Sequence, residues 1–356
     1  MCHLGKVKGK KKREHFKGCL MGGAIGDAFG APVDLLSFAE IKKEYGEQGL
    51  LDLVCDEKGK AIITDDTQLT LFTAEGLLRA ETRKRARGAC YHPSIVYYAY
   101  LRWLYTQGYP KNKNIEGIYN GYLIKIRDLH VSRSPGKTCL SALASGEYGT
   151  IEKHINDSKG CGGVKRIAPV GLYVSRKNAF DLGSECAALT HGHPSGYLAA
   201  GVLAYIIAGI IEGLEIEEAV FGALDKLVYY DGYEECNSSI RKAIKLAESD
   251  EGPRKAISLI GEGRVAEEAL AIAIYAALKH SHDFKQALYV AINHDGGSNS
   301  AGAIAGNILG AYLGINEMPA EWIEKVELTD ILLQVADDLF TGYKGTLDWW
   351  RRYPGY

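Results

Sequence analysis

Four adjacent polar residues, Thr64, Asp65, Asp66 and Thr67, open the amphipathic stretch ITDDTQLTLFTAEGLL. Two carboxylates and two hydroxyl groups at one helix start supply the oxygen ligands that Mg²⁺ or Ca²⁺ prefers. The same residue types are good helix N-caps, and acidic side chains favour the first turn of a helix. Capping needs only one or two of the four residues, so the sequence leaves a structural and a metal-binding interpretation open.

A glycine-rich stretch, NDSKGCGGVKRIAPVG at residues 156–171, is a second candidate for chemistry. Its flexible backbone could present several N–H groups to an anion, and Lys159, Lys165 and Arg166 could add electrostatic attraction. The stretch matches neither the GxxxxGK[ST] phosphate loop nor the GxGxxG dinucleotide pattern, so by itself it is a weak indication of phosphate binding.

Two further segments carry polar residues next to apolar runs. In LTHGHPSGY, His191 and His193 precede a predicted helix that has Tyr197 in its first turn. Two imidazoles two residues apart do not share a helix face, so we expect them to contact a ligand or to cap the helix rather than to bind a metal as a pair. The segment NHDGGSNSAGAIAG, residues 293–306, has the form of a metal-binding loop that enters a helix, but Asp295 is its only carboxylate.

Helical periodicity dominates the chain and predicts an all-α fold. Apolar residues recur at i, i+3 and i+4 with polar residues between them. This pattern covers residues 38–46, 70–86, 93–108, 219–230, 239–250, 266–280, 284–293 and 328–343. Gly108 and Pro110 mark the end of one helix, and Asp283 is expected to cap the start of another.

Two predicted helices carry glycine at every fourth position. These glycines are Gly18, Gly22, Gly26 and Gly30 in one helix and Gly302, Gly306, Gly310 and Gly314 in the other. Four-residue spacing places each set on one helix face, where the missing side chains let another backbone approach closely. Glycine costs up to ~1 kcal/mol relative to alanine at each site, so tight packing must offset it. We therefore expect both helices to lie in the core and to pack unusually closely, in the simplest case against each other.

Composition and charge exclude several classes of protein. The 356 residues have a formal net charge of -2, which argues against general attraction to nucleic acid. The eight cysteines form no CxxC pair, which is typical of reduced thiols in the cytoplasm. The longest apolar run, residues 196–211, is shorter than the roughly 20 residues that span a bilayer, and we interpret it as a buried helix rather than a membrane contact.

We predict one large domain at residues 16–356, because no segment has the composition of a linker. The preceding residues 1–15 are rich in lysine and lack the apolar run of a signal peptide. They are expected to form a solvated, mobile arm, and this arm could bind a protein partner.

Taken together and in order, these segments resemble the ADP-ribosylglycohydrolase family, which includes the glycohydrolase that reactivates dinitrogenase reductase. The matching segments are GCLMGGAIGDAFGAP, TDDTQLTLFTAEGLL, RSPGKTCLSAL, NDSKGCGGVKRIAPVG, LTHGHPSGYLAAG, EEALAIAIYAAL and NHDGGSNSAGAIAGNILGA, and they span roughly residues 16 to 315. The resemblance implies a compact single-domain helical fold with two Mg²⁺ ions at the base of a cleft that holds ADP-ribose. It also implies cleavage of an N- or O-glycosidic bond at the anomeric carbon of the distal ribose.

The resemblance assigns roles to particular residues. Thr64, Asp65 and Asp66 match the first group of metal ligands, and Asp34 stands where the family has a glutamate over the distal ribose. His191 and Tyr197 match positions at the nucleotide end of the cleft. The diphosphate-binding loop of the family corresponds to residues 158–164, of which Ser158, Gly160, Cys161, Gly162, Gly163 and Val164 are the expected contacts.

The loop at residues 294–302 departs from the family pattern H-x-G-D-x-D-S-T-G. Gly297, Asn299 and Ala301 replace the two aspartates and the threonine that serve the metals. This removes two negative charges and up to three oxygen donors from a site for two dications. Asn299 could still offer a carbonyl oxygen, and Asp295 could restore part of the charge if the loop bends back. We expect one weakly held Mg²⁺ ion or none.

Two functions remain open. The first is an ADP-ribosylglycohydrolase with an altered metal site, in which Asp65, Asp66 or Asp295 acts as the base. The second is a catalytically degenerate relative that binds ADP-ribose or a similar nucleotide for sensing, sequestration or toxin immunity. The retained segments favour the enzyme, whereas the altered loop favours the binding protein. A purely structural role gives no reason to keep TDDT, NDSKGCGG and THGHP together.

Overall fold

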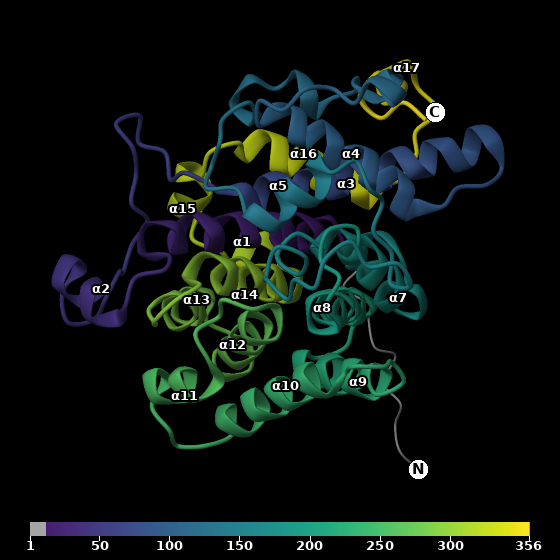
Figure 1. Ribbon diagram of the computed structural model, residues 1–356. Coiled ribbons are helices and arrows are strands. Elements are labelled where there is room, and N and C mark those ends of the chain that lie inside the picture. The colour runs from purple at the N-terminus through teal and green to yellow at the C-terminus, as the bar shows by residue number, and fades with distance from the viewer. Residues whose placement is uncertain (1–11, 356) are drawn as a thin grey trace, which may run out of the picture.

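The computed structural model describes residues 12–355, and within this range all named elements are helices (Figure 1). The α-helices are α1 (Arg13–Gly30), α2 (Phe38–Tyr45), α3 (Asp65–Arg87), α4 (His92–Thr106), α5 (Lys137–Ala144), α6 (Ala168–Tyr173), α7 (Arg176–Ala188), α8 (Pro194–Glu212), α9 (Ile216–Leu227), α10 (Glu234–Ala247), α11 (Pro253–Ile260), α12 (Ala266–Lys279), α13 (Phe284–Ile292), α14 (Ser298–Leu313), α15 (Ala320–Lys325), α16 (Thr329–Thr341) and α17 (Leu347–Arg352). Short 3-10 helices lie at Ala31–Val33, Lys113–Ile118, Leu123–Lys125, Arg127–Leu129 and Ile315–Glu317. Within the described range, extended pairing is limited to two isolated bridges. The all-α prediction is confirmed.

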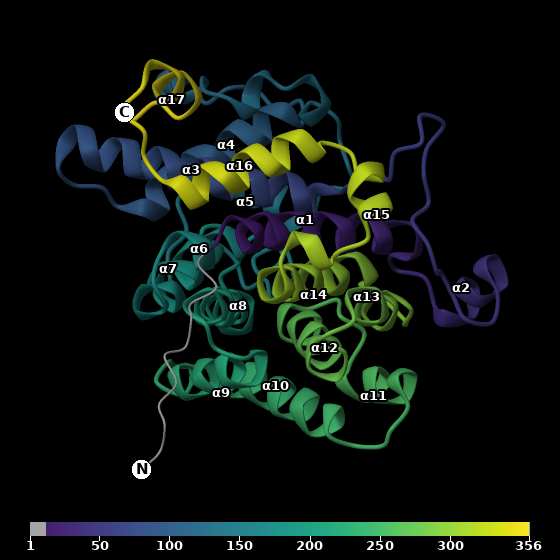
Figure 2. The same cartoon turned by 180° about the vertical axis from the view of Figure 1, so that it is seen from behind.

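The two glycine-patterned helices, α1 and α14, lie side by side in the middle of the molecule (Figures 1 and 2). A Cβ atom at Gly22 would come within 3.0 Å of the Gly306 carbonyl oxygen, and one at Gly26 would meet the Gly302 carbonyl in the same way. Gly18 and Gly310 form the next such pair along the helices. The expectation that the two helices pack closely against each other is confirmed, because only glycine lets these backbones touch.

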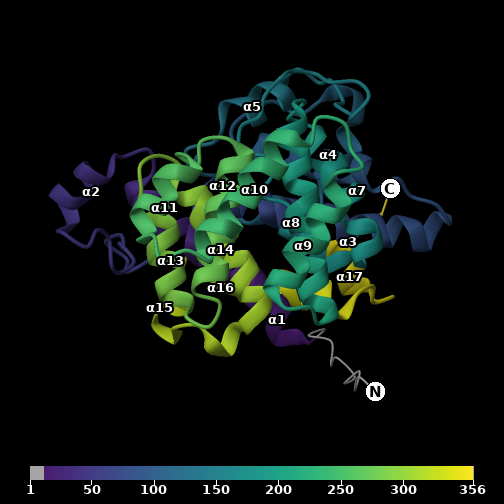
Figure 3. The same cartoon turned by 90° about the horizontal axis from the view of Figure 1, so that it is seen from below.

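The other helices form layers on both sides of this pair. Helices α3, α4 and α16 lie on one side of α1, whereas α8, α12 and α13 lie on the α14 side, with α9, α10 and α11 outermost (Figures 1 and 2). Helix α8 is long and apolar enough to span a membrane, but 89% of its most apolar window is buried inside the protein. The expectation that residues 196–211 form a buried helix is met. Helix α2 stands at one edge of the molecule, away from α17 and the C-terminus (Figure 3).

The folded domain begins earlier than the sequence suggested. Helix α1 starts at Arg13, whose guanidinium pairs with the carboxylate of Asp337 on α16. Residues 13–15, which the sequence placed in the arm, therefore belong to the helical domain. Residues 1–11 of the predicted arm, with the protein contact proposed for it, lie outside the described residues.

Candidate active site

The start of α3 is tied to α1 through a buried carboxylate. Thr64 is the N-cap of α3, and its Oγ1 accepts a hydrogen bond from the Asp66 N–H at 3.2 Å. Asp27 of α1 accepts hydrogen bonds from the N–H and hydroxyl groups of both Thr64 and Thr67 at 2.6–3.2 Å. Burial raises the pKa of the Asp27 carboxyl, and the bonds from Thr64 and Thr67 oppose this rise. Both threonine hydroxyls are thus engaged within the protein, as the capping interpretation requires.

Asp65 and Asp66 are buried and share one cation. The ammonium of Lys165 lies 3.2 Å from Asp65 Oδ1 and forms an ion pair with Asp66 Oδ1. Burial alone would lower the pKa of Lys165, but Asp65 and Asp66 offset that effect and hold it well above its usual value. Burial raises the pKa of the Asp66 carboxyl well above its usual range, and Lys165 opposes this rise. The negative charges of Asp65 and Asp27 raise the same pKa further.

The roles suggested for Lys165 and Arg166 from the sequence need correction. Both were expected to attract an anion to the glycine-rich loop. Lys165 instead turns toward α3, and Arg166 is fully buried, where it donates to Thr190 Oγ1 at 2.7 Å and lies over the Tyr100 ring at 4.3 Å. The positive charge therefore lies beneath the loop and not at its surface.

The first residues of α14 complete this group. Asn299 Nδ2 lies 3.3 Å from Thr64 Oγ1, and Asn299 Oδ1 accepts the Ser300 N–H at 2.7 Å. The Ser300 hydroxyl donates to Asp66 Oδ2 at 3.3 Å, and the Cys161 thiol is 3.3 Å from the same hydroxyl. The structure thus brings Asn299 and the first turn of α3 together, as the resemblance implied.

Asp34 lies at the N-terminus of α14, beside the same group. Burial raises the pKa of its carboxyl, while Lys165 and the backbone N–H groups of Asn299 and Ser298 oppose the rise. Its Oδ1 atom is buried and accepts no hydrogen bond from the residues that the structure describes. One acceptor therefore remains open near Lys165.

A short segment covers the carboxylates from the other side. The N–H of Gly136 donates to Asp65 Oδ2 at 3.2 Å, and the Asp65 N–H donates to the Arg133 carbonyl at 2.9 Å. Asp65 and Asp66 are each 1% exposed.

These residues do not fit a site for two magnesium ions. The Lys165 ammonium takes the facing oxygens of Asp65 and Asp66, and Gly297 and Ala301 have no side-chain donor. Within residues 12–355, no three His, Cys, Asp or Glu side chains form a group that could hold a metal ion. Mg²⁺ requires near-octahedral oxygen coordination, which a lysine at this point obstructs.

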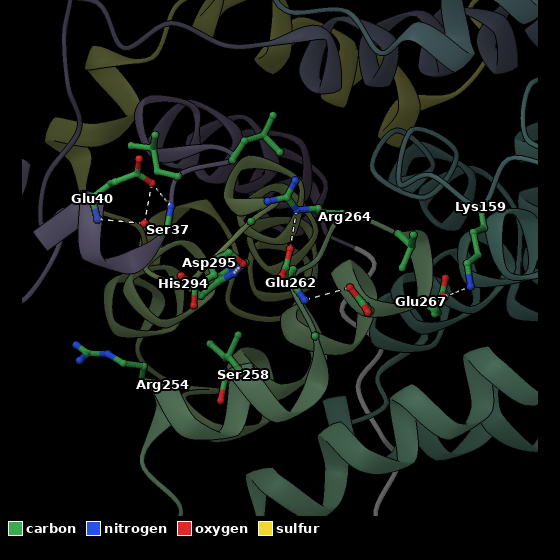
Figure 4. A pocket seen from close by; sticks show the side chains of 17 residues that line it. Ser37, Glu40, Lys159, Arg254, Ser258, Glu262, Arg264, Glu267, His294 and Asp295 are labelled. Carbon is green, nitrogen blue, oxygen red and sulfur yellow. Dashed lines mark hydrogen bonds and ion pairs between the residues drawn. The ribbon is translucent and has the colours of Figure 1, made fainter.

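Asp295, the third candidate base, lies apart from the buried group. Its side chain is exposed, and Oδ1 accepts the N–H of Phe38 at the start of α2 at 2.8 Å. It lines a cavity of about 860 Å³ that also borders Lys159 and Glu262 (Figure 4). Asp65 and Asp66 are not among the residues that line this cavity. Asp295 therefore lies at the surface, next to the start of α2, and not beside Asp66.

The predicted diphosphate loop, residues 158–164, lies between this cavity and the buried carboxylates. Gly160 bridges Val265, and its N–H donates to Ser158 Oγ at 3.3 Å. Val164 N–H donates to the Cys161 carbonyl at 3.1 Å, which curls the loop into a turn, and Gly163 packs against the Ala187 side chain.

Of the two residues assigned to the nucleotide end, His191 packs against the loop and Tyr197 lies beside His154. A Cβ atom at Gly162 would come 2.9 Å from His191 Cε1, so the ring fills the space beneath the glycines. His191 Nδ1 is 2.8 Å from Thr190 Oγ1. Burial lowers the pKa of the imidazole, and the positive charges of Arg166 and Lys165 lower it further. Tyr197 is buried with its ring 6.1 Å from that of His154. The His191 side chain therefore lies beneath the loop that the resemblance assigned to the diphosphate, whereas Tyr197 contacts His154.

Sequence reasoning missed Asp27 as a site residue and assigned Lys165 to the loop surface instead of to the carboxylates. The signal for Asp27 was a lone carboxylate inside a glycine-rich apolar helix, GCLMGGAIGDAFG, where an unpaired charge is costly. For Lys165 no local pattern indicates whether the side chain points to the loop surface or into the core.

Comparisons with known proteins show which family the chain resembles over its length. The sequence profile of the ADP-ribosylglycohydrolase family matches residues 8–347. An uncharacterized protein of Archaeoglobus fulgidus is 26% identical over 330 residues, covering 92% of this chain and 96% of that protein. The ADP-ribosylhydrolase ARH3 of Bos taurus is 24% identical, covering 91% of this chain and 93% of that protein.

Two further relatives extend the likeness. The ADP-ribosylarginine hydrolase Tri1 of Pseudomonas putida is 24% identical, covering 91% of this chain and 77% of that protein. A solved structure described as an ADP-ribosylglycohydrolase-related protein complex superposes with a TM-score of 0.63 at 24% identity, covering 93% of this chain and 99% of that one. The profile match spans nearly the whole chain, and the helical fold is shared. This protein therefore belongs to the ADP-ribosylglycohydrolase family.

Proposed function

We propose that this protein hydrolyses the glycosidic bond between ADP-ribose and a modified acceptor. The observation that carries the proposal is the buried Asp65–Asp66 pair directly beside the glycine-rich loop, in a chain that matches the family over residues 8–347. Relatives that carry the names ADP-ribosylhydrolase and ADP-ribosylarginine hydrolase support a substrate of this class. The acceptor is either an arginine, as in the name of the second relative, or another group that is bonded to ADP-ribose through nitrogen or oxygen.

We assign each part of the substrate to a part of the chain. The cavity of about 860 Å³ lies within the size range of sites for small molecules and cofactors, and it borders Lys159 of the loop. In our proposal the backbone of the loop receives the diphosphate, and the open Oδ1 of Asp34 accepts a hydroxyl of the distal ribose. The anomeric carbon then lies toward Asp66.

The reaction requires a base and a leaving group that takes a proton. Water attacks the anomeric carbon, the bond from that carbon to the acceptor breaks, and the water proton passes to a carboxylate. Asp66 suits this role because burial raises its pKa, which strengthens it as a base in its ionised form. The carboxylic acid formed in this way gives the proton to the acceptor as the acceptor leaves, which restores the carboxylate, and free ADP-ribose is the second product.

Turnover of purified protein tests the proposal. ADP-ribosyl-arginine and ADP-ribosylated proteins would be incubated with the chain, and released ADP-ribose would be measured by chromatography. We expect release by the wild type, with loss in Asp66→Asn. No release from any N- or O-linked substrate, with Mg²⁺ or with EDTA, would refute the enzymatic function.

One observation favours a second candidate, a protein that binds ADP-ribose without turnover. The three departures at Gly297, Asn299 and Ala301 remove donors that the family uses. Calorimetry with ADP-ribose distinguishes the two candidates: saturable binding without turnover would support the binding protein, whereas binding together with release of the acceptor supports the enzyme.

A further inference from the structure

We propose that Lys165 is a built-in cation that takes the place of a divalent metal ion between Asp65 and Asp66. Its ammonium contacts one oxygen of each carboxylate, and all three side chains are at most 7% exposed. Members of the family are in general metal-dependent. This inference rests on the proposed function only in taking the Asp65–Asp66 pair as the reactive centre.

The backbone fixes the position of the lysine. The Lys165 N–H donates to the Cys161 carbonyl at 3.2 Å, and its carbonyl accepts the Thr70 hydroxyl at 3.4 Å. The first bond ties the residue to the glycine-rich loop and the second ties it to α3. The ammonium is therefore held at the carboxylates by the fold and does not reach them as a mobile surface side chain.

The charges of the site are consistent with a lysine in place of a divalent metal ion. Like carboxylates buried side by side repel each other, and an opposite charge within about 4 Å stabilises their ionised form. Relative to the family pattern, the chain lacks carboxylates at Gly297 and Asn299, and it holds one internal positive charge at Lys165. Two carboxylates with one ammonium between them need less added positive charge than a site with four carboxylates.

Two further oxygen-bearing side chains beside the pair are engaged within the protein. Asn299 Oδ1 accepts the Ser300 N–H, and Asp27 accepts four hydrogen bonds from Thr64 and Thr67. The gap between α1, α3 and α14 that Asp66 and Lys165 line has no room for a water molecule. An added ion would have to displace the ammonium.

The first arm of the experiment measures metal binding without turnover. Wild-type protein and Lys165→Met, which keeps the chain length and removes the charge, would be titrated with Mg²⁺ and Mn²⁺ by thermal shift and calorimetry. We expect the Tm of the wild type to stay constant. We expect Lys165→Met to have a lower Tm in EDTA and to regain part of it with either ion, because a bound ion stabilises the folded state according to its affinity. Lys255→Met, at an exposed lysine, serves as the matched control and should behave as wild type.

A second arm applies if Lys165→Met does not fold. The triple change Lys165→Met with Asp65→Asn and Asp66→Asn removes the buried charges together, and we expect it to fold. Failure of the triple variant would overturn the proposal, because charge compensation would then not be what the lysine supplies.

Two further results would also overturn it. One is stoichiometric binding of Mg²⁺ or Mn²⁺ by the wild type that Asp66→Asn abolishes. The other is a folded Lys165→Met protein whose Tm does not respond to either ion. Both readouts are independent of hydrolysis, so a failed turnover assay would refute the proposed function and leave this inference standing.

Discussion

Helix α3 carries two buried charge clusters that differ in kind. In its middle, Glu75 Oε2 accepts a hydrogen bond from Arg102 Nε at 2.8 Å and forms an ion pair with Arg102 Nη2 at 2.8 Å. Arg79 lies 4.0 Å from the same carboxylate. At its N-terminus, Asp65 and Asp66 share the single ammonium of Lys165. The first cluster has two cations for one anion, whereas the second has two anions for one cation.

The partners of the cations explain the difference. Arg79 donates to the carbonyls of Asn120 and Pro354, and Arg102 donates to the carbonyl of Ile118, so the guanidinium groups are tied to distant backbone. A planar guanidinium fixes geometry, whereas an ammonium is a point charge on a flexible stem. The comparison teaches that the arginine cluster fixes distant backbone segments to α3, while the lysine cluster holds two carboxylates beside the glycine-rich loop.

Removal of an arginine of the first cluster should have the largest effect. Arg102→Met leaves Glu75 buried without its closest cation, and we expect the free energy of unfolding to fall by about 3 to 5 kcal/mol. Urea unfolding measures this loss. Arg85→Met, at an exposed i,i+4 pair with Glu81, should cost only about 0.3 to 0.5 kcal/mol. A cost for Arg102→Met as small as that of the control would remove the distinction between the clusters.

Asp66→Asn should reduce catalysis more than it reduces stability. It removes a carboxylate from beside two others, so we expect a smaller loss of stability than in Arg102→Met, together with a fall of about 10²- to 10⁴-fold in kcat. Asp295→Asn, at the exposed carboxylate above α2, is the matched variant. Loss of kcat in Asp295→Asn instead of Asp66→Asn would move the base to the surface loop.

The lysine cluster should also depend on how closely α14 approaches α1. In Gly26→Ala the new methyl group would meet the Gly302 carbonyl, and we expect a cost of about 1 to 3 kcal/mol with weaker ADP-ribose binding, because Asn299 and Ser300 move with α14. Gly117→Ala, whose methyl group would enter open space, is the control. Unchanged stability and affinity in Gly26→Ala would contradict the close helix contact.

A smaller effect should appear in the pH dependence of stability. Burial lowers the pKa of His191 well below 6.5, so below pH 6.5 the unfolded chain binds a proton that the folded chain does not. Stability should therefore fall as pH decreases below 6.5, by up to about 1.4 kcal/mol per pH unit for this one residue. His191→Gln should reduce that slope in urea unfolding measured between pH 5 and 7. An equal slope in the two proteins would mean that His191 is protonated in the fold.

Much of the architecture could be read from local patterns. The periodicity of apolar residues predicts α3, α4 and α12, and Asp283 caps α13 as expected, since its side chain accepts the Gln286 N–H at 3.0 Å. Helices α6 and α11 were not predicted, because short segments contain too few turns to show a period. The glycine spacing was the strongest long-range signal, since four-residue repeats in two helices have few other physical explanations.

For the site, the sequence identified residues but not where their side chains point. It identified TDDT, the glycine-rich loop and the lost ligands at Gly297, Asn299 and Ala301, because residue types and their order are local facts. It did not show that Lys165 turns inward or that Asp295 binds the start of α2. Those outcomes depend on contacts between segments that are 99 residues apart for Lys165 and Asp66 and 257 residues apart for Asp295 and Phe38.

The sequence alone determined the helical class, the close pair of glycine helices and the shortage of acidic ligands, since each follows from composition or from a repeat along one element. The tertiary structure decided which charge balances Asp65 and Asp66. A side chain of lysine length can reach either face of the loop that carries it, and only the packing of α1, α3 and α14 around buried carboxylates selects the inward one.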